Sequence, residues 1–217
     1  MKKYELLIFD FDGTLVDTVE DITYYANEVL VEFGYDVRTV PEVRKAIGFG
    51  VHELLKELAP DFDQNDSRFE EAVGLFKKKY RDGPVRKTAA FQGVRSMLEG
   101  PLANTKKAIV TNKPQDITEQ ILEELDLARY FEMTIGMNSG FLPKPDPASM
   151  LHVMRSLGCL PQKTIFIGDS GVDASTAQNA GIDFAWVSYG YDQPKTITPV
   201  ARFSSARQWS SLVDNFN

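Results

Sequence analysis

Two aspartates stand where an apolar segment ends and a turn begins. Asp10 and Asp12 follow the apolar residues 6–9, and Gly13 permits a close approach of the backbone. Open α/β sheets bind ligands at the carboxyl ends of their strands, so two carboxylates here suit a hard cation and a phosphate group. An Asp-Gly pair alone is typical of a solvated turn, and the remaining residues must therefore support a chemical role.

A second segment, 109–114, has the same layout. An apolar run ends at Thr111 and Asn112, and a helical pattern follows Pro114. A hydroxyl beside a helix N-terminus can bind a phosphate oxygen, although Thr and Asn are equally good helix caps.

Lys144 lies in the run Leu142-Pro143-Lys144-Pro145, where the flanking prolines stiffen the backbone. A stiff segment reduces the entropy lost when a long side chain is fixed. A lysine held beside clustered acids would offset the charge of a phosphate, and the alternative is a surface lysine in a proline-rich turn.

A third apolar run, 165–168, ends at Asp169, and Asp173 falls in the first turn of the helix expected next. Oxygen ligands without a Cys or His cluster favour Mg²⁺ over zinc. We expect a metal at Asp169, whereas helix capping is an equally good role for Asp173.

Composition limits the classes of protein to which this chain can belong. The chain has 217 residues, enough for one domain plus an insertion, and its net charge of −7 argues against binding nucleic acid. A small anionic substrate stays possible because a metal can reverse the sign of a cleft. A single cysteine excludes an intrachain disulfide, and without a signal-peptide core or a long apolar stretch we expect a cytoplasmic protein with no membrane contact.

Apolar runs alternate with helical patterns along most of the chain. The expected strands are 6–11, 107–111, 131–137, 164–168 and 184–189, and the expected helices are 94–98, 115–125, 147–157 and 173–180. This alternation predicts a doubly wound α/β fold, with a mostly parallel, Rossmann-like sheet covered on both faces by helices.

The alternation stops between residues 16 and 84, where helical periodicity continues without a clear strand. Leu54, Leu55 and Leu58 fit one helical face, and Asp82-Gly83-Pro84 ends the stretch. We predict an α-helical domain at 16–84, inserted into an α/β core formed by 1–15 and 85–217.

In order and approximate spacing, these segments resemble the four motifs of the haloacid dehalogenase superfamily in its phosphatase form. The resemblance implies that Asp10 is a nucleophile that forms an aspartyl phosphate and that Asp12 is the general acid and base. It implies phosphate binding by Thr111, Asn112 and Lys144. It also implies a Mg²⁺ cofactor, whose ligands would be Asp10, Asp12 (through its backbone carbonyl), Asp169 and Asp173.

The helical insertion resembles the small cap of one branch of this superfamily. Gly48 and Gly50, followed by Leu54-Leu55, resemble a segment of phosphoglycolate phosphatases, as do residues 91–94 and 187–191. The resemblance implies a phosphomonoesterase for a small phosphorylated metabolite, with 2-phosphoglycolate as the first choice. Gly48, Gly50, His52 and Arg44 are candidate substrate residues in the cap. The commoner roles are a helix-start turn for the two glycines and structural or solvated positions for His52 and Arg44.

Several alternatives stay open. The same superfamily includes pyrophosphatases, nucleotidases, sugar phosphatases and phosphomutases, and a non-catalytic phosphate-binding protein could share the fold. Gly171 stands where the family often has a basic residue, and residues 138–141 are less charged than usual. The sequence leaves open whether the protein is a monomer or a homodimer.

Overall fold

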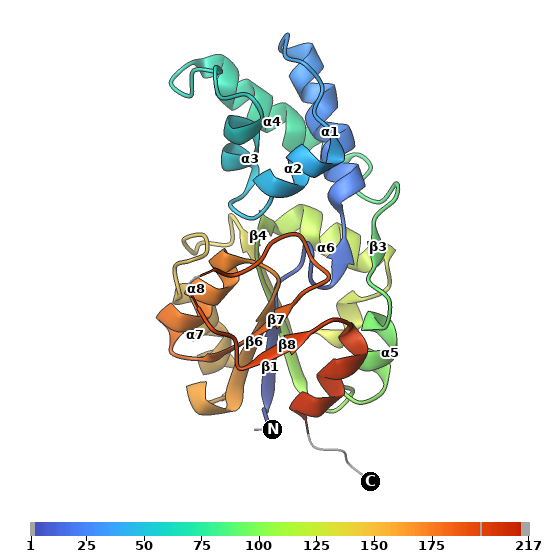
Figure 1. Cartoon of the computed structure of the whole chain (residues 1–217), viewed down its shortest axis with the longest axis vertical. Coiled ribbons are helices and arrows are strands. Elements are labelled where there is room, and N and C mark those ends of the chain that lie inside the picture. The colour runs from blue at the N-terminus through green and yellow to red at the C-terminus, as the bar shows by residue number, and fades with distance from the viewer. Residues whose placement is uncertain (1–2, 196, 214–217) are drawn as a thin grey trace.

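The architecture is a parallel sheet below a group of four helices (Figure 1). It is seen in a computed structural model that describes residues 3–195 and 197–213. Every neighbouring pair of strands in the main sheet is parallel. In spatial order the strands are β5 (Met133–Met137), β4 (Lys106–Pro114), β1 (Leu6–Phe9), β6 (Thr164–Gly168), β7 (Asp183–Val187) and β8 (Ala201–Phe203).

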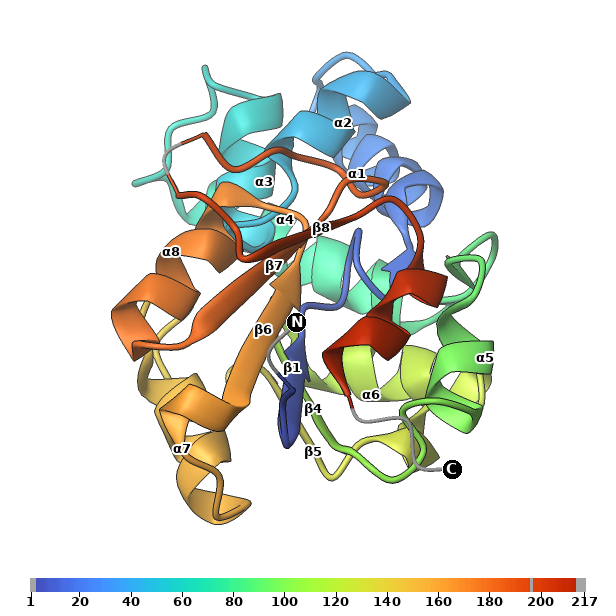
Figure 2. The ribbon, with the colours of Figure 1, turned by 60° about the horizontal axis from the view of Figure 1, so that its bottom comes forward.

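Helices cover both faces of this sheet (Figure 2). Side chains of β1 alternate between two apolar cores, since Leu7 packs on one face and Ile8 on the other. The first face carries α5 (Val94–Glu99), α6 (Gln115–Glu124) and the 3-10 helix η3 (Ala206–Leu212); the second carries α7 (Ala148–Ser156) and α8 (Gly171–Ala180). The predicted doubly wound fold is confirmed. Short 3-10 turns, Ala128–Tyr130 and Pro161–Lys163, precede β5 and β6.

Four helices lie together beyond the carboxyl ends of the strands (Figure 1). They are α1 (Val19–Glu32), α2 (Val40–Ala46), α3 (Val51–Leu58) and α4 (Ser67–Arg81). Apolar residues spaced three or four apart form one buried face of α1 and of α4, and the rings of Tyr25 and Tyr80 stack 5.2 Å apart between them. We call these four helices the cap; the domain boundaries at residues 16 and 84 stay a prediction.

Two short strands connect the cap to the sheet, and no sequence pattern predicted them. β2 (Val16–Asp17) lies at the start of the stretch expected to be helical throughout. It pairs antiparallel with β3 (Ala89–Ala90), which follows that stretch. Two residues are too few to produce a recognisable alternation. β8 and η3 were also not predicted. Separately, no helix among the described residues is long and apolar enough to cross a bilayer.

Candidate active site

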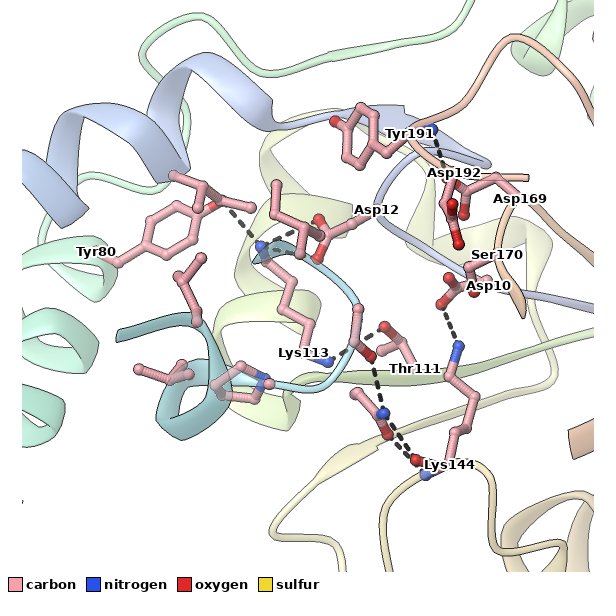
Figure 3. A pocket seen from close by; sticks show the side chains of 18 of the residues that line it. Asp10, Asp12, Tyr80, Thr111, Lys113, Lys144, Asp169, Ser170, Tyr191 and Asp192 are labelled. Atoms are coloured by element: carbon pink, nitrogen blue, oxygen red, sulfur yellow. Dashed lines mark hydrogen bonds and ion pairs between the residues drawn. The ribbon is translucent and has the colours of Figure 1, made fainter. Parts of the chain in front are cut away.

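A pocket opens where β1, β4 and β6 end, between the sheet and the cap (Figure 3). Its enclosed volume is about 60 Å³. The core contributes most of its polar lining, and the cap contributes apolar side chains and two glycines. The lining includes Asp10, Asp12, Ile22, Ile47, Gly48, Gly50, Val51, Leu54, Phe76, Tyr80, Thr111, Asn112, Lys113, Lys144, Asp169, Ser170, Tyr191 and Asp192.

Lys144 joins two of the predicted site aspartates. Its Nζ lies 2.7 Å from Oδ1 of Asp10 and 2.6 Å from Oδ1 of Asp173, and its side chain is only 3% exposed. Burial alone would lower the pKa of Lys144, but the two carboxylates outweigh it and hold that pKa above its usual value. The ammonium is therefore charged and fixed next to the carboxylate of Asp10.

Asn112 holds the backbone of Lys144 from both sides. Its Oδ1 accepts the N–H of Lys144 over 2.7 Å, and its Nδ2 donates to the carbonyl of Lys144 over 3.1 Å and to that of Gly48 over 3.0 Å. The amide thus links the core to the cap. Thr111 is buried on the pocket wall, and its Oγ1 accepts the N–H of Lys113 over 3.2 Å.

Asp10, Asp169 and Asp173 form a buried acidic cluster, with one oxygen of each within 4.8 Å of the others. Burial, followed by the charge of Asp173, raises the pKa of Asp10 to about 7, although Lys144 acts in the opposite direction. Burial and the two neighbouring carboxylates raise the pKa of Asp169 well above its usual value. Three carboxylates facing one lysine leave an excess of negative charge, and a hard divalent cation would offset it. The donor set fits Mg²⁺.

Asp173 has both of its oxygens engaged within the protein. Oδ1 binds Lys144, while Oδ2 accepts from the hydroxyl of Ser170 over 2.6 Å and from its N–H over 3.0 Å. With Ser170 as the N-cap of α8, these bonds complete a capping box. The capping alternative for Asp173 is confirmed, and its role as a metal ligand stays a prediction.

Asp12 has a basic partner that sequence reasoning missed. Its Oδ1 accepts from the hydroxyl of Thr18 over 2.7 Å, and its two oxygens lie 3.1 and 3.3 Å from Nζ of Lys113. Lys113 also donates to the hydroxyl of Tyr80 over 2.9 Å. Because desolvation outweighs the charge of Asp12, the pKa of Lys113 is lowered. The position of Lys113 directly after Thr111 and Asn112, at a strand end, was the available signal.

Tyr191 is a second residue that was missed, although it falls in the 187–191 segment noted above. Its backbone N–H donates to Oδ2 of Asp169 over 2.6 Å, and its hydroxyl accepts the N–H of Thr18 over 2.7 Å. Burial and the charge of Asp12 raise the pKa of Tyr191, so its hydroxyl stays neutral. No sequence pattern placed this ring at the start of α1.

The four cap candidates are not brought to one place. Gly48 and Gly50 line the pocket, and their φ angles of 133° and 91° lie in the region that favours glycine. Arg44 is exposed, with its guanidinium 5.5 Å from the centre of the Tyr191 ring. His52 is outside the pocket lining and its Nε2 lies 3.0 Å from Glu70 on the cap surface. The structure therefore does not bring His52 to the pocket.

The fold and site together define an α/β protein with an acidic pocket, containing two buried lysines, at the carboxyl edge of its sheet. Residues 7–187 match the model of the haloacid dehalogenase-like hydrolases. The chain belongs to this family, and the resemblance inferred from its motifs is confirmed.

Individual relatives agree with this assignment. The chain is 35% identical over 201 residues to phosphoglycolate phosphatase 1 of Pseudomonas aeruginosa, covering 90% of this chain and 74% of that protein. It is 31% identical over 211 residues to the phosphoglycolate phosphatase of Aquifex aeolicus, covering 97% of each. The crystal structure of a predicted phosphoglycolate phosphatase from Haemophilus somnus has a TM-score of 0.88 at 25% identity, covering 96% of this chain and 97% of that one.

Proposed function

We propose that this protein is a Mg²⁺-dependent phosphomonoesterase that hydrolyses 2-phosphoglycolate through an aspartyl-phosphate intermediate. The observation that carries the proposal is the pair of pocket aspartates with separate buried lysine partners, Asp10 with Lys144 and Asp12 with Lys113. Two carboxylates in different surroundings suit two roles, nucleophile and proton donor. The named relatives supply the choice of substrate.

In the first step a carboxylate oxygen of Asp10 attacks phosphorus and the bond from phosphorus to the ester oxygen breaks. Asp12 gives its proton to the leaving oxygen, which departs as an alcohol. In this proposal Lys144 and Thr111 bind the phosphoryl oxygens, and Lys144 compensates their charge.

In the second step water attacks the phosphorus of the aspartyl phosphate. Asp12 now accepts a proton from this water, and the bond between phosphorus and the Asp10 oxygen breaks to release inorganic phosphate. Asp10, the backbone of Asp12, Asp169 and Asp173 would hold Mg²⁺, which supplies charge compensation for the phosphoryl group when bound. The apolar cap side chains keep bulk water away from the reacting atoms.

Phosphate release tests the proposal directly. The wild-type protein is incubated with a panel of phosphate esters and pyrophosphate, with Mg²⁺ and with a chelator. The expected result is release from 2-phosphoglycolate that requires Mg²⁺ and is absent in Asp10→Asn. Preference for pyrophosphate, a nucleotide or a sugar phosphate would overturn the substrate, and no release from any compound would favour the non-catalytic alternative.

A further inference from the structure

Two lysines are buried in the pocket, and the proposed reaction assigns a task to one of them. The side chains of Lys144 and Lys113 are each 3% exposed. Lys144 contacts the nucleophile, whereas Lys113 lies on the other side of the site, between Asp12 and Tyr80 (Figure 3). Removing an ammonium from water is costly, so a second buried lysine needs an explanation beyond binding the transferred phosphate.

Lys113 has the capacity to bind one more acceptor. An ammonium has three N–H donors, and Nζ makes three contacts: 3.1 and 3.3 Å to the two oxygens of the Asp12 carboxylate and 2.9 Å to the hydroxyl of Tyr80. Because both Asp12 oxygens belong to one carboxylate, a single N–H shared between them serves both, and the remaining N–H can meet a ligand. The pocket around it carries the apolar side chains Ile22, Ile47, Val51, Leu54 and Phe76. In such surroundings a charge-assisted hydrogen bond is stronger than in water, so an anionic group of a ligand would be favoured here.

Distance limits where that anionic group can be. Nζ of Lys113 lies 3.1 Å from Oδ1 of Asp12, the group proposed to protonate the ester oxygen. Two hydrogen bonds in series, of about 3 Å each, put Nζ within about 6 Å of that oxygen. A carboxylate on the carbon that bears the ester oxygen falls within this range. A charged group several bonds farther along a sugar or nucleotide need not lie within this distance of the ester oxygen.

The cap helps to set the position of the Lys113 ammonium. The hydroxyl of Tyr80, near the end of α4, accepts from Lys113, and Nζ lies 4.3 Å from the centre of the same ring. Tyr80 is itself buried, and its ring stacks on Tyr25 of α1. Lys113 is therefore held by both the sheet and the cap rather than left to sample many rotamers.

We infer that Lys113 is a specificity-determining residue that binds a carboxylate next to the phosphate ester, so that the substrate class is the phosphate esters of 2-hydroxy carboxylic acids. The inference rests on the proposed phosphatase function and extends it to a residue and a chemical group.

Two esters that differ in one group test the inference. The ratio of kcat/KM for 2-phosphoglycolate to kcat/KM for 2-hydroxyethyl phosphate is measured in the wild type and in Lys113→Met. Both esters release an alcohol from a primary carbon, so any effect through Asp12 cancels in the ratio. We expect the ratio to fall about ten- to a hundredfold in Lys113→Met, the range of a hydrogen bond to a charged group.

Lys107→Met is the matched control. Lys107 is also buried, lies toward the other end of β4 and donates to the backbone carbonyl of Leu102 over 2.8 Å, outside the pocket. The control should keep the wild-type ratio. A ratio of two kcat/KM values does not depend on how much of a variant is folded, so partial loss of stability leaves the test valid.

The outcomes separate the inference from the function on which it rests. If both esters lose activity equally in Lys113→Met, Lys113 acts only through Asp12 and the inference is wrong. A wild type that hydrolyses both esters equally well also overturns the inference, while the phosphatase function stands. A wild type that hydrolyses no ester overturns both.

Discussion

Tyr191 and Asp169 are joined by a hydrogen bond of 2.6 Å from the backbone N–H of the first to Oδ2 of the second. The hydroxyl of the same tyrosine accepts the N–H of Thr18 over 2.7 Å and donates to Asp17 over 2.8 Å. One residue therefore connects a proposed metal ligand to the start of the first cap helix.

Tyr191→Phe retains the backbone bond to Asp169 and removes the bonds of the hydroxyl. We expect kcat/KM to fall about tenfold, since the lost hydrogen bonds contribute about 1 kcal/mol each. The Mg²⁺ concentration for half-maximal activity should stay unchanged. Tyr4→Phe is the control, because it removes a hydroxyl bond of 2.8 Å to Asp183 at the amino end of the sheet. Wild-type kinetics in Tyr191→Phe would show that this link has no catalytic role.

Asp10→Asn should abolish turnover and leave the fold intact. A neutral amide is too weak a nucleophile to attack phosphorus, so phosphate release should fall at least about a thousandfold. The Tm in a chelator should be equal to or above that of the wild type, because one of three clustered carboxylates loses its charge. Normal turnover would exclude the covalent mechanism, and a collapsed Tm would contradict the expected repulsion.

Asp12→Ala tests the role of the general acid independently of the nucleophile, Asp10. The variant should lose activity toward an alkyl phosphate by about a hundredfold or more, since an alkoxide needs a proton to leave. Activity toward p-nitrophenyl phosphate should fall much less, because nitrophenolate leaves without protonation. Equal losses on the two esters, measured by phosphate release, would contradict the role of Asp12 as general acid.

Stability in the absence of metal should depend on pH because of the acidic cluster. The pKa of Asp10 is raised to about 7, and that of Asp169 is also raised. The folded protein therefore holds protons that the unfolded chain releases near pH 4, and the free energy of unfolding falls as pH rises from about 4 to 7.

Mg²⁺ should reverse this trend. Binding to the ionised carboxylates would increase the Tm, and the increase should be larger at pH 8 than at pH 6. Thermal unfolding at both pH values, with Mg²⁺ and with a chelator, measures the difference. Asp10→Asn should reduce the increase in Tm that Mg²⁺ causes. If that increase depends neither on pH nor on this substitution, the ion binds elsewhere.

Asp21 should stabilise the connection between the cap and the core. From α1 its carboxylate accepts the N–H groups of Arg86, Lys87 and Thr88 over 2.8 to 3.0 Å. Burial alone would raise the pKa of Asp21, but the bonds from Lys87 and Thr88 outweigh it, so the pKa is lowered. The stabilisation is thus present above the ordinary aspartate pKa, about 3.9, and is lost as pH falls through the lower folded value.

Asp21→Asn should reduce the free energy of unfolding by about 2 kcal/mol at neutral pH, because an amide cannot accept all these bonds. Urea unfolding at pH 7 and at pH 3 measures the effect, which should shrink at the lower pH. Asp63→Asn, on an exposed cap loop, is the control. An equal loss at both pH values would show that the charge of Asp21 is not responsible.

Much of the fold and site followed from local sequence. Apolar runs ending at Asp10, Thr111 and Asp169 predicted three strands whose carboxyl ends meet, and parallel pairing then brings these side chains together. The two-residue strands at Val16 and Ala89 did not follow, because their pairing is supported by the surrounding structure rather than by a pattern.

The sequence by itself determined which chemical groups end the strands, because strand ends and turn residues are local properties of the chain. Only the tertiary structure decided their partners. Lys113 meets Asp12 across 101 positions and Tyr191 meets Asp169 across 22, while His52 points to Glu70 instead of the pocket. These contacts depend on how the cap packs over the sheet, and that packing is a sum of many weak apolar contacts with no short-range signature.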